Sequence, residues 1–130
     1  MCITTKSYLK NGGSSLGRHY IVEIYGCKNI EVLNDLEFIR SMMLEAAYRC
    51  GSTVIGNVFH QFEPVGITGV VAISESHLSI HTWPEYAYAA IDVFTCGTTV
   101  DPDLAISYIV ETLKGIPLTM KIDRGIPLLF

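Results

Sequence analysis

Residues 68–84 read TGVVAISESHLSIHTWP, a run whose pattern predicts two neighbouring strands. Up to Ser74 the run is mostly apolar, which predicts a strand that is buried on both faces. From Leu78 to Trp83 apolar and polar residues alternate, which predicts a second strand with one apolar and one polar face. The proline that follows ends this strand because it cannot donate a hydrogen bond to a ladder. A connection this short predicts that the two strands pair as an antiparallel hairpin.

The same kinds of pattern predict the elements on either side of this hairpin. Four further strands are expected at residues 18–25, 53–62, 88–96 and 118–122. A helix should start at Asn34, which has capping-box spacing to Glu37, and stop at Gly51. A second helix should start at the N-cap Asp101 and stop at Gly115. This order, with its hairpin-length connections, predicts an α+β fold in which helices cover one face of an antiparallel sheet.

The length of 130 residues allows a single domain, residues 1–130, with one core. Residues 1–15 end in an Asn-Gly-Gly-Ser-Ser stretch and are expected to form a flexible arm. Hydrophobic residues make up 49% of the chain and charged residues only 17%, below the usual quarter. A small domain has difficulty hiding this much apolar surface, so on composition alone self-association and a monomer are about equally expected.

Charge and cysteine content exclude several classes of protein. The net charge is −4, and no cluster of Lys or Arg marks a nucleic-acid surface. The longest apolar stretch, residues 69–73, is too short to cross a bilayer, and we expect no secretory signal. The four cysteines are Cys2, Cys27, Cys50 and Cys96. They show neither CxxC spacing nor a dense disulfide pattern, so we expect reduced thiols in a cytoplasmic protein. The charge distribution and the short apolar stretches predict no nucleic-acid and no membrane partner.

Residues 74–85 concentrate the side chains that could carry chemistry, with three serines, two histidines and two glutamates. The residues alone leave three interpretations open. His77 and His81 could bind a metal ion if His60 joined them through the fold. A serine and a histidine could form a hydrolase pair, although the GxSxG elbow is missing. The polar side chains could also be purely structural, which is the commonest role for serines on a strand.

Several motifs resemble those of one enzyme family. Residues 73–86, ISESHLSIHTWPEY, resemble the processing site of the pyruvoyl-dependent S-adenosylmethionine decarboxylases of bacteria and archaea. Residues 89–97, AAIDVFTCG, resemble the second motif of that family, and residues 59–62 (FHQF) and 66–71 (GITGVV) also fit. The likeness runs over residues 16–103, about two thirds of the chain. The motifs fall at the same spacing as in the family, which makes the resemblance specific.

The resemblance implies a proenzyme that cuts itself between Glu75 and Ser76 into a β chain, residues 1–75, and an α chain, residues 76–130. The Ser76 hydroxyl would attack the Glu75 carbonyl and turn the amide into an ester. His81 would then remove the Ser76 α-proton, and β-elimination would leave a pyruvoyl group.

The resemblance also implies a cofactor and a substrate. The pyruvoyl group would replace pyridoxal phosphate as the electron sink, with a Schiff base to S-adenosylmethionine, and no metal is expected. Cys96 would reprotonate the substrate after carbon dioxide leaves, and the Thr68 hydroxyl would assist processing. Glu85 would hold the ribose, while Phe62 and Trp83 are candidates for contact with the adenine or the sulfonium. The product, decarboxylated S-adenosylmethionine, serves spermidine biosynthesis.

The family fold is a two-layer α/β sandwich that pairs into a homodimer with active sites near the interface, so the same is expected of this chain. Two alternatives stay open. A pyruvoyl enzyme of this type could decarboxylate ornithine or arginine instead, because only the side-chain pocket needs to differ. A non-catalytic regulatory paralogue is disfavoured because Ser76, His81 and Cys96 are all present.

Overall fold

The computed structural model describes residues 15–126. Its strands are β1 (Gly17–Tyr25), β2 (Val54–Gln61), β3 (Ile67–Ile73), β4 (Ser76–Trp83), β5 (Tyr88–Cys96) and β6 (Ile116–Arg124). Its helices are α2 (Leu36–Arg49) and α3 (Pro102–Leu113), with the short 3-10 turns η1 (Val32–Asn34) and η2 (Pro84–Tyr86). The arm expected at residues 1–15 lies, apart from Ser15, outside the described residues.

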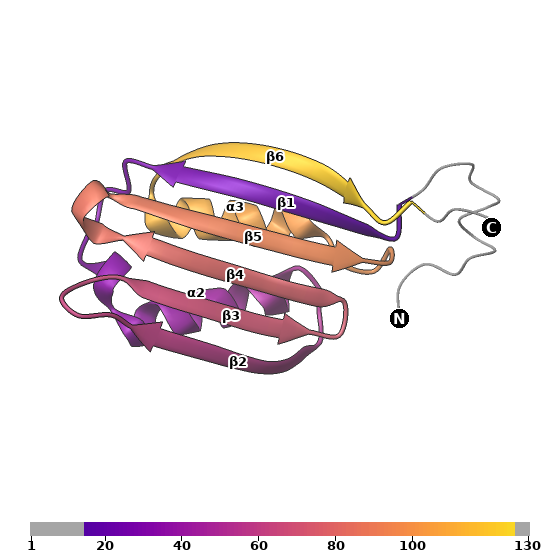
Figure 1. The fold of residues 1–130 in the computed structure, drawn as a ribbon, viewed down its shortest axis with the longest axis horizontal. Helices are drawn as coiled ribbons and strands as arrows, with labels where there is room; N and C mark the ends of the chain where they lie inside the picture. Colours follow the sequence, from indigo (N-terminus) through magenta and orange to yellow (C-terminus); the bar gives the residue numbers. More distant parts are fainter. Residues whose placement is uncertain (1–14, 127–130) are drawn as a thin grey trace.

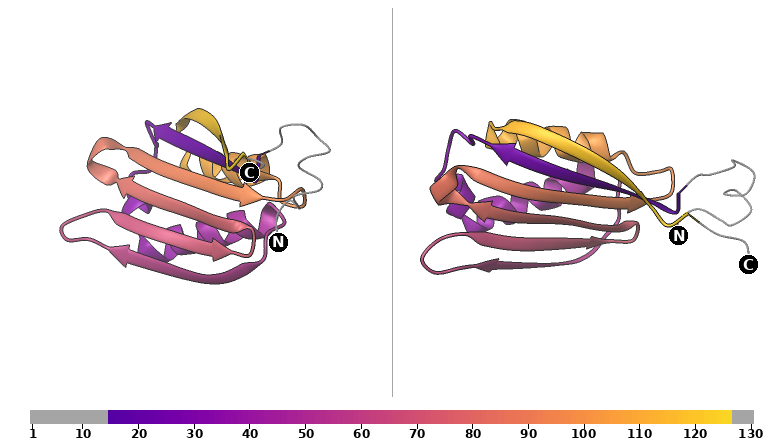
Figure 2. Two further views of the ribbon diagram at one scale, coloured as in Figure 1. Left: turned by 45° about the vertical axis from the view of Figure 1, so that its right-hand side comes forward. Right: turned by 45° about the horizontal axis from the view of Figure 1, so that its top comes forward.

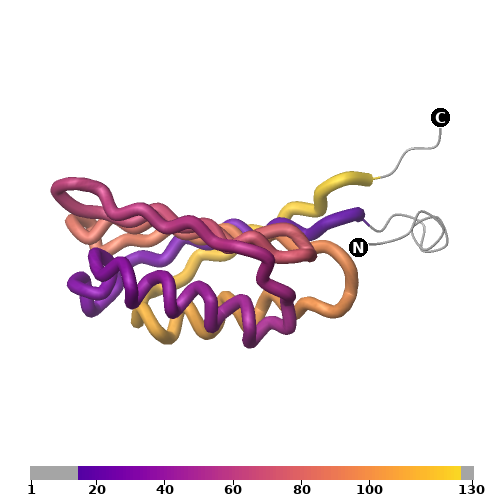
Figure 3. The backbone as a smooth tube through the Cα atoms, turned by 90° about the horizontal axis from the view of Figure 1, so that it is seen from below, coloured from indigo at the N-terminus to yellow at the C-terminus, as the bar shows by residue number. Residues whose placement is uncertain are grey.

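All these strands form one antiparallel sheet in the order β2-β3-β4-β5-β1-β6 (Figure 1). Both helices lie against the same side of the sheet, and within residues 15–126 its other side carries no helix (Figure 3). The predicted α+β fold, with two layers and helices on one face, is therefore confirmed. Strands β1 and β6 run along one border of the sheet and β2 along the other (Figure 2).

Alternation along the central strands separates a core face from an open face. On β4 and β5 the side chains of Leu78, Ile80, Ile91 and Val93 are almost wholly buried beneath the helices. The intervening positions, such as His77, point to the open face. Burial of the apolar side chains against the helices stabilises the sheet, with about 1.5–3 kcal/mol for each fully buried one. Polar side chains of the central strands therefore lie on the open face, where they are available for reactions.

The helix boundaries show one error of prediction. Asp35, not Asn34, caps α2, because its carboxylate accepts a hydrogen bond from the Phe38 N–H at 3.0 Å. The Asn34 side chain instead accepts the Gly66 N–H at 2.9 Å, a contact made across the fold. The predicted capping box at Asn34 is therefore wrong. The start of α3 is as predicted, since the Asp101 carboxylate accepts the Asp103 N–H at 3.1 Å.

No helix in the described range 15–126 has the length and apolar character needed to span a bilayer.

Candidate active site

The predicted cleavage site lies at the tip of the β3–β4 hairpin. Ile73 pairs with Ser76, so Ser74 and Glu75 form the connecting loop. Thr53 fastens this loop, because its carbonyl accepts the Ser74 N–H at 2.8 Å and its own N–H donates to the Glu75 carboxylate at 3.1 Å. The predicted scissile bond is thus held on both sides by strand pairing and by Thr53.

Ser76 has a φ of 132°, a value that residues with a side chain rarely adopt. Such a conformation costs on the order of 1–3 kcal/mol and persists only where the surrounding structure enforces it. Here the pairing of Ser76 with Ile73 on one side and with Thr95 on the other enforces it. Strain is therefore stored at the residue whose peptide bond is predicted to break.

The Glu75 carbonyl oxygen is bound by one residue of β5. The Cys96 N–H donates to this oxygen at 3.0 Å, and the Cys96 Sγ lies 3.2 Å from it. Two groups that converge on one carbonyl oxygen resemble an oxyanion hole, which stabilises the negative charge that forms when a nucleophile attacks. The expectation of reduced thiols is wrong for Cys96, which is disulfide-bonded in this structure. Only the reduced thiol of Cys96 would donate the second hydrogen bond. We call Glu75, Ser76 and Cys96 the cleavage cluster.

A second group of predicted residues surrounds a cavity of about 340 Å³ at the other end of β4. The cavity is lined by Phe62, Thr68, His81, Trp83 and Glu85, together with neighbouring residues. The Thr68 Oγ1 lies 3.0 Å from the His81 Nδ1, because the two residues are direct partners across β3 and β4. We call these five residues the pocket cluster. The structure thus brings together all three predicted substrate contacts with the predicted processing residues Thr68 and His81.

The two clusters are far apart within one chain. Ser76 and His81 are five residues apart on the same strand, a separation of about 17 Å at the usual rise per residue. His81 therefore does not reach the Ser76 α-proton of its own chain. The predicted role of His81 in processing stays a prediction, and it requires a His81 that belongs to another copy of the chain.

An aromatic row borders the pocket cluster. The rings of Trp83 and Tyr88, and of Tyr88 and Tyr25, each have centroids 5.3 Å apart. The hydroxyls of Tyr88 and Tyr25 both donate to the Glu23 carboxylate, at 2.7 and 3.2 Å. Burial, and then the hydrogen bond and the charge of Glu23, raise the pKa of Tyr88 to about 12. The row holds Trp83 in place beside the cavity.

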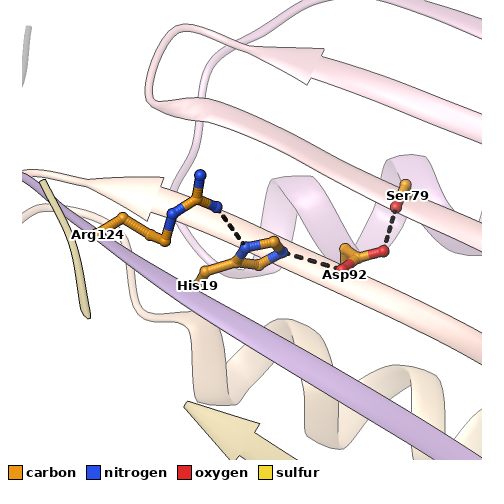
Figure 4. Close-up of polar contacts among 4 residues, drawn as sticks. All are labelled: His19, Ser79, Asp92 and Arg124. Atoms are coloured by element: carbon orange, nitrogen blue, oxygen red, sulfur yellow. Dashed lines mark hydrogen bonds and ion pairs between the residues drawn. The ribbon is translucent and has the colours of Figure 1, made fainter. Parts of the chain in front are cut away.

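The sequence did not reveal a polar network on the open face (Figure 4). The Arg124 guanidinium lies 3.0 Å from the His19 Nδ1, and the His19 Nε2 lies 2.9 Å from an Asp92 oxygen. Because arginine only donates, the His19 Nδ1 must accept, so the Nε2 carries a proton and donates to Asp92. Ser79 donates to the other Asp92 oxygen at 3.0 Å. Only the cross-strand register, which is absent from the sequence, brings these residues together.

The network gives no support to the hydrolase interpretation at Ser79. In a hydrolase the serine donates to a histidine that acts as its base, whereas Ser79 donates to a carboxylate. The metal interpretation gains no support either. Among residues 15–126 no group of three or more His, Cys, Asp or Glu side chains is placed to hold a metal ion. His77 contacts His19 and Phe94 edge-on, and burial lowers the pKa of His77.

Comparisons with known proteins identify the family of this chain. The family model described as S-adenosylmethionine decarboxylase matches residues 18–125. A proenzyme of that name from Caldicellulosiruptor saccharolyticus is 54% identical over 113 residues, which cover 86% of this chain and 90% of the relative. Another from Thermosipho melanesiensis is 58% identical over 101 residues, 78% of this chain and 77% of the relative.

A solved structure gives the same result. The crystal structure of adenosylmethionine decarboxylase from Aquifex aeolicus superposes with a TM-score of 0.82 and 35% sequence identity. The match covers 88% of this chain and 95% of that one. Since the family model spans most of the chain and the two proenzymes are 54% and 58% identical to it, the family prediction made from the sequence is confirmed. The chain belongs to the S-adenosylmethionine decarboxylase family.

Proposed function

We propose that this chain cuts itself between Glu75 and Ser76 and then decarboxylates S-adenosylmethionine. The observation that carries the proposal is the cleavage cluster, in which a strained Ser76 follows a carbonyl bound by Cys96. The relatives are named as proenzymes of S-adenosylmethionine decarboxylase, which agrees with a chain that must be processed before it acts.

In the cleavage, the Ser76 Oγ attacks the Glu75 carbonyl carbon, and the C–N bond between the two residues breaks. The Cys96 N–H is already in hydrogen-bond contact with the Glu75 oxygen, so it stabilises the charge that develops there without rearrangement. Loss of the Ser76 α-proton then eliminates the Glu75 carboxylate and leaves the precursor of a pyruvoyl group at residue 76. Relief of the strain at Ser76 favours the same direction.

The residues of the cleavage cluster fit a pyruvoyl group, because residue 76 adjoins the buried Cys96 side chain. When present, this ketone binds the substrate amine and withdraws electrons as carbon dioxide leaves. The reduced thiol of Cys96 would donate the proton that replaces the carboxylate. No metal ion and no pyridoxal phosphate are needed for this chemistry.

The pocket cluster is suited to a nucleoside with a positive sulfonium. Phe62 and Trp83 are 47% and 40% exposed, which leaves parts of their rings available to an adenine or a cation. Glu85 is exposed beside them and can accept hydrogen bonds from the ribose hydroxyls. The relatives are named as decarboxylases of S-adenosylmethionine, so the alternative substrates ornithine and arginine are not favoured.

We further propose that a homodimer completes the site. The cleavage and pocket clusters lie about 17 Å apart in one chain, a distance that the residues named cannot bridge. In a two-fold dimer the same patch of each copy contacts the other, so each cleavage cluster can meet the partner's pocket cluster. The open face also exposes apolar side chains at Val58, Val70, Leu118, Met120 and Ile122, which a second copy would cover. The cytoplasmic location stays a prediction.

The mass of the purified chain tests the cleavage. We expect two fragments that end and begin at residues 75 and 76, with a pyruvoyl group on the second, and one uncut chain for Ser76→Ala. Release of carbon dioxide from S-adenosylmethionine, ornithine and arginine then tests the substrate. A folded native chain that stays uncut would contradict the proposal, and equal turnover of the amino acids would contradict the substrate assignment.

A further inference from the structure

Thr95 carries the only buried side-chain oxygen or nitrogen within residues 15–126 that lacks a hydrogen-bond partner. Thr95 is 0% exposed, so water at the protein surface cannot satisfy its hydroxyl. Unpartnered buried hydroxyls are rare in folded proteins because they lose their hydrogen bonds to water without replacement. The unpartnered hydroxyl of Thr95 therefore suggests that this residue has a role other than stabilising the fold.

The position of Thr95 suggests that role. Thr95 is the direct partner of Ser76 in the pairing of β4 with β5, and the next residue, Cys96, binds the Glu75 carbonyl. Two consecutive residues of β5 therefore face the two residues of the predicted scissile bond. In the described part of the chain the Ser76 hydroxyl has no hydrogen-bond partner either.

We propose that the Thr95 hydroxyl positions the Ser76 nucleophile for self-cleavage, an inference that rests on the proposed function. In the reactive rotamer the Ser76 O–H donates to the Thr95 Oγ1, which turns a lone pair of the Ser76 oxygen toward the Glu75 carbonyl carbon. Side chains of directly paired residues have Cβ atoms about 4.5–5.5 Å apart, a span that two hydroxyls bridge with a single hydrogen bond.

The step is balanced without any other reactant. A bond forms between the Ser76 oxygen and the Glu75 carbonyl carbon, and the bond from that carbon to the Ser76 nitrogen breaks. The hydroxyl proton ends on the freed nitrogen, so an amide becomes an ester and an amine. Thr95 is unchanged at the end and serves as a positioning residue.

A positioning role and a structural role predict different results for Thr95→Val. Valine has nearly the shape of threonine and removes a hydroxyl that makes no hydrogen bond in the fold, so stability should be unchanged or higher. Cleavage, in contrast, should slow by about tenfold, the effect of one lost neutral hydrogen bond on a barrier. Thr95→Ser keeps the hydroxyl and should cleave at close to the native rate.

A buried threonine on the same sheet provides a matched control. The Thr82 hydroxyl donates to the Leu33 carbonyl at 2.7 Å and accepts the Ile67 N–H at 2.9 Å. Thr82→Val therefore removes two hydrogen bonds of the fold and should lower the melting temperature, the structural effect that Thr95→Val should lack.

The experiment follows cleavage of the full chain over time by intact mass under reducing conditions, and it measures melting temperatures in the uncleavable Ser76→Ala background. For Thr95→Val we expect slow cleavage, an undiminished melting temperature, and uncut chains that resist hydroxylamine because no ester has formed. A native cleavage rate for Thr95→Val would overturn the inference, as would accumulation of a hydroxylamine-sensitive ester. If the native chain itself stays uncut, the proposed function fails; if only Thr95→Val behaves like the native chain, the inference on Thr95 fails alone.

Discussion

The two ends of β4 carry sites of different kinds. At the Ser76 end the backbone dominates, since a strained φ and the N–H of Cys96 act on one peptide bond. At the Trp83 end, side chains surround a cavity of about 340 Å³. In the proposed mechanism, self-cleavage therefore depends on the fold of the chain, whereas the choice of substrate depends on side chains that can change separately.

The largest effect should come from Cys96→Ala, which removes the sulfur but keeps the N–H that binds Glu75. Loss of a proton donor should reduce carbon dioxide release per cleaved chain by about 10²–10⁴-fold, and cleavage should slow much less. Cleavage is followed by mass and decarboxylation by labelled carbon dioxide, both with reductant present. Cys50→Ala is the control, because Cys50 is a buried free thiol outside both clusters. Equal decarboxylation by the two variants would remove Cys96 from the reaction.

An intermediate effect is expected at the opposite end of β4. Glu85→Gln weakens hydrogen bonds to the ribose that involve a charged group, which are worth about 1.5–3 kcal/mol, so kcat/KM should fall by roughly 10–150-fold. Self-cleavage should proceed at the native rate because it involves no substrate. Glu63→Gln is the matched control, since Glu63 is exposed and does not line the cavity. If Glu85→Gln blocks cleavage, self-cleavage and substrate binding do not depend on separate ends of β4.

The smallest effect concerns His77, which adjoins the cleavage cluster. Burial lowers its pKa below the usual 6.5, so near that pH the unfolded chain binds more protons than the folded one. The free energy of unfolding should therefore fall as the pH is lowered through 6.5. In a Ser76→Ala background, His77→Gln should reduce this pH dependence, as measured by urea unfolding between pH 7 and pH 5. An unchanged slope would show that His77 does not contribute.

The strands were predictable because alternation along Leu78 to Trp83 and along β5 reflects burial beneath the helices. The start of α2 was not, because Asn34 binds Gly66, and sequence spacing does not show such a contact across the fold. The network of His19 and Asp92 was missed for the same reason, since it depends on the register of three strands.

The sequence predicted which residues form the candidate site better than it predicted how these residues are arranged. Motif resemblance selected all five residues of the pocket cluster, and the structure gathers them around one cavity. The distance between Ser76 and His81 follows from the rise of a strand, yet the resemblance joined them in one step of the reaction. The strand geometry and the joint reaction step implied by the resemblance are compatible only if Ser76 of one copy meets His81 of another. Thr95 could not be singled out from the sequence, because only the folded chain shows that its hydroxyl is buried without a hydrogen-bond partner.

The most direct measurement pairs a chain that is mutated in the pocket cluster with a chain that is mutated in the cleavage cluster. His81→Ala and Cys96→Ala are expressed together with different tags, and the mixed dimer is purified and assayed for cleavage and carbon dioxide release under reducing conditions. If each site combines the cleavage cluster of one copy with the pocket cluster of the other, one of the two sites is intact, and about half of the native activity returns. If the mixed dimer is as inactive as the two single variants, each site lies within one chain and the sharing of sites is wrong.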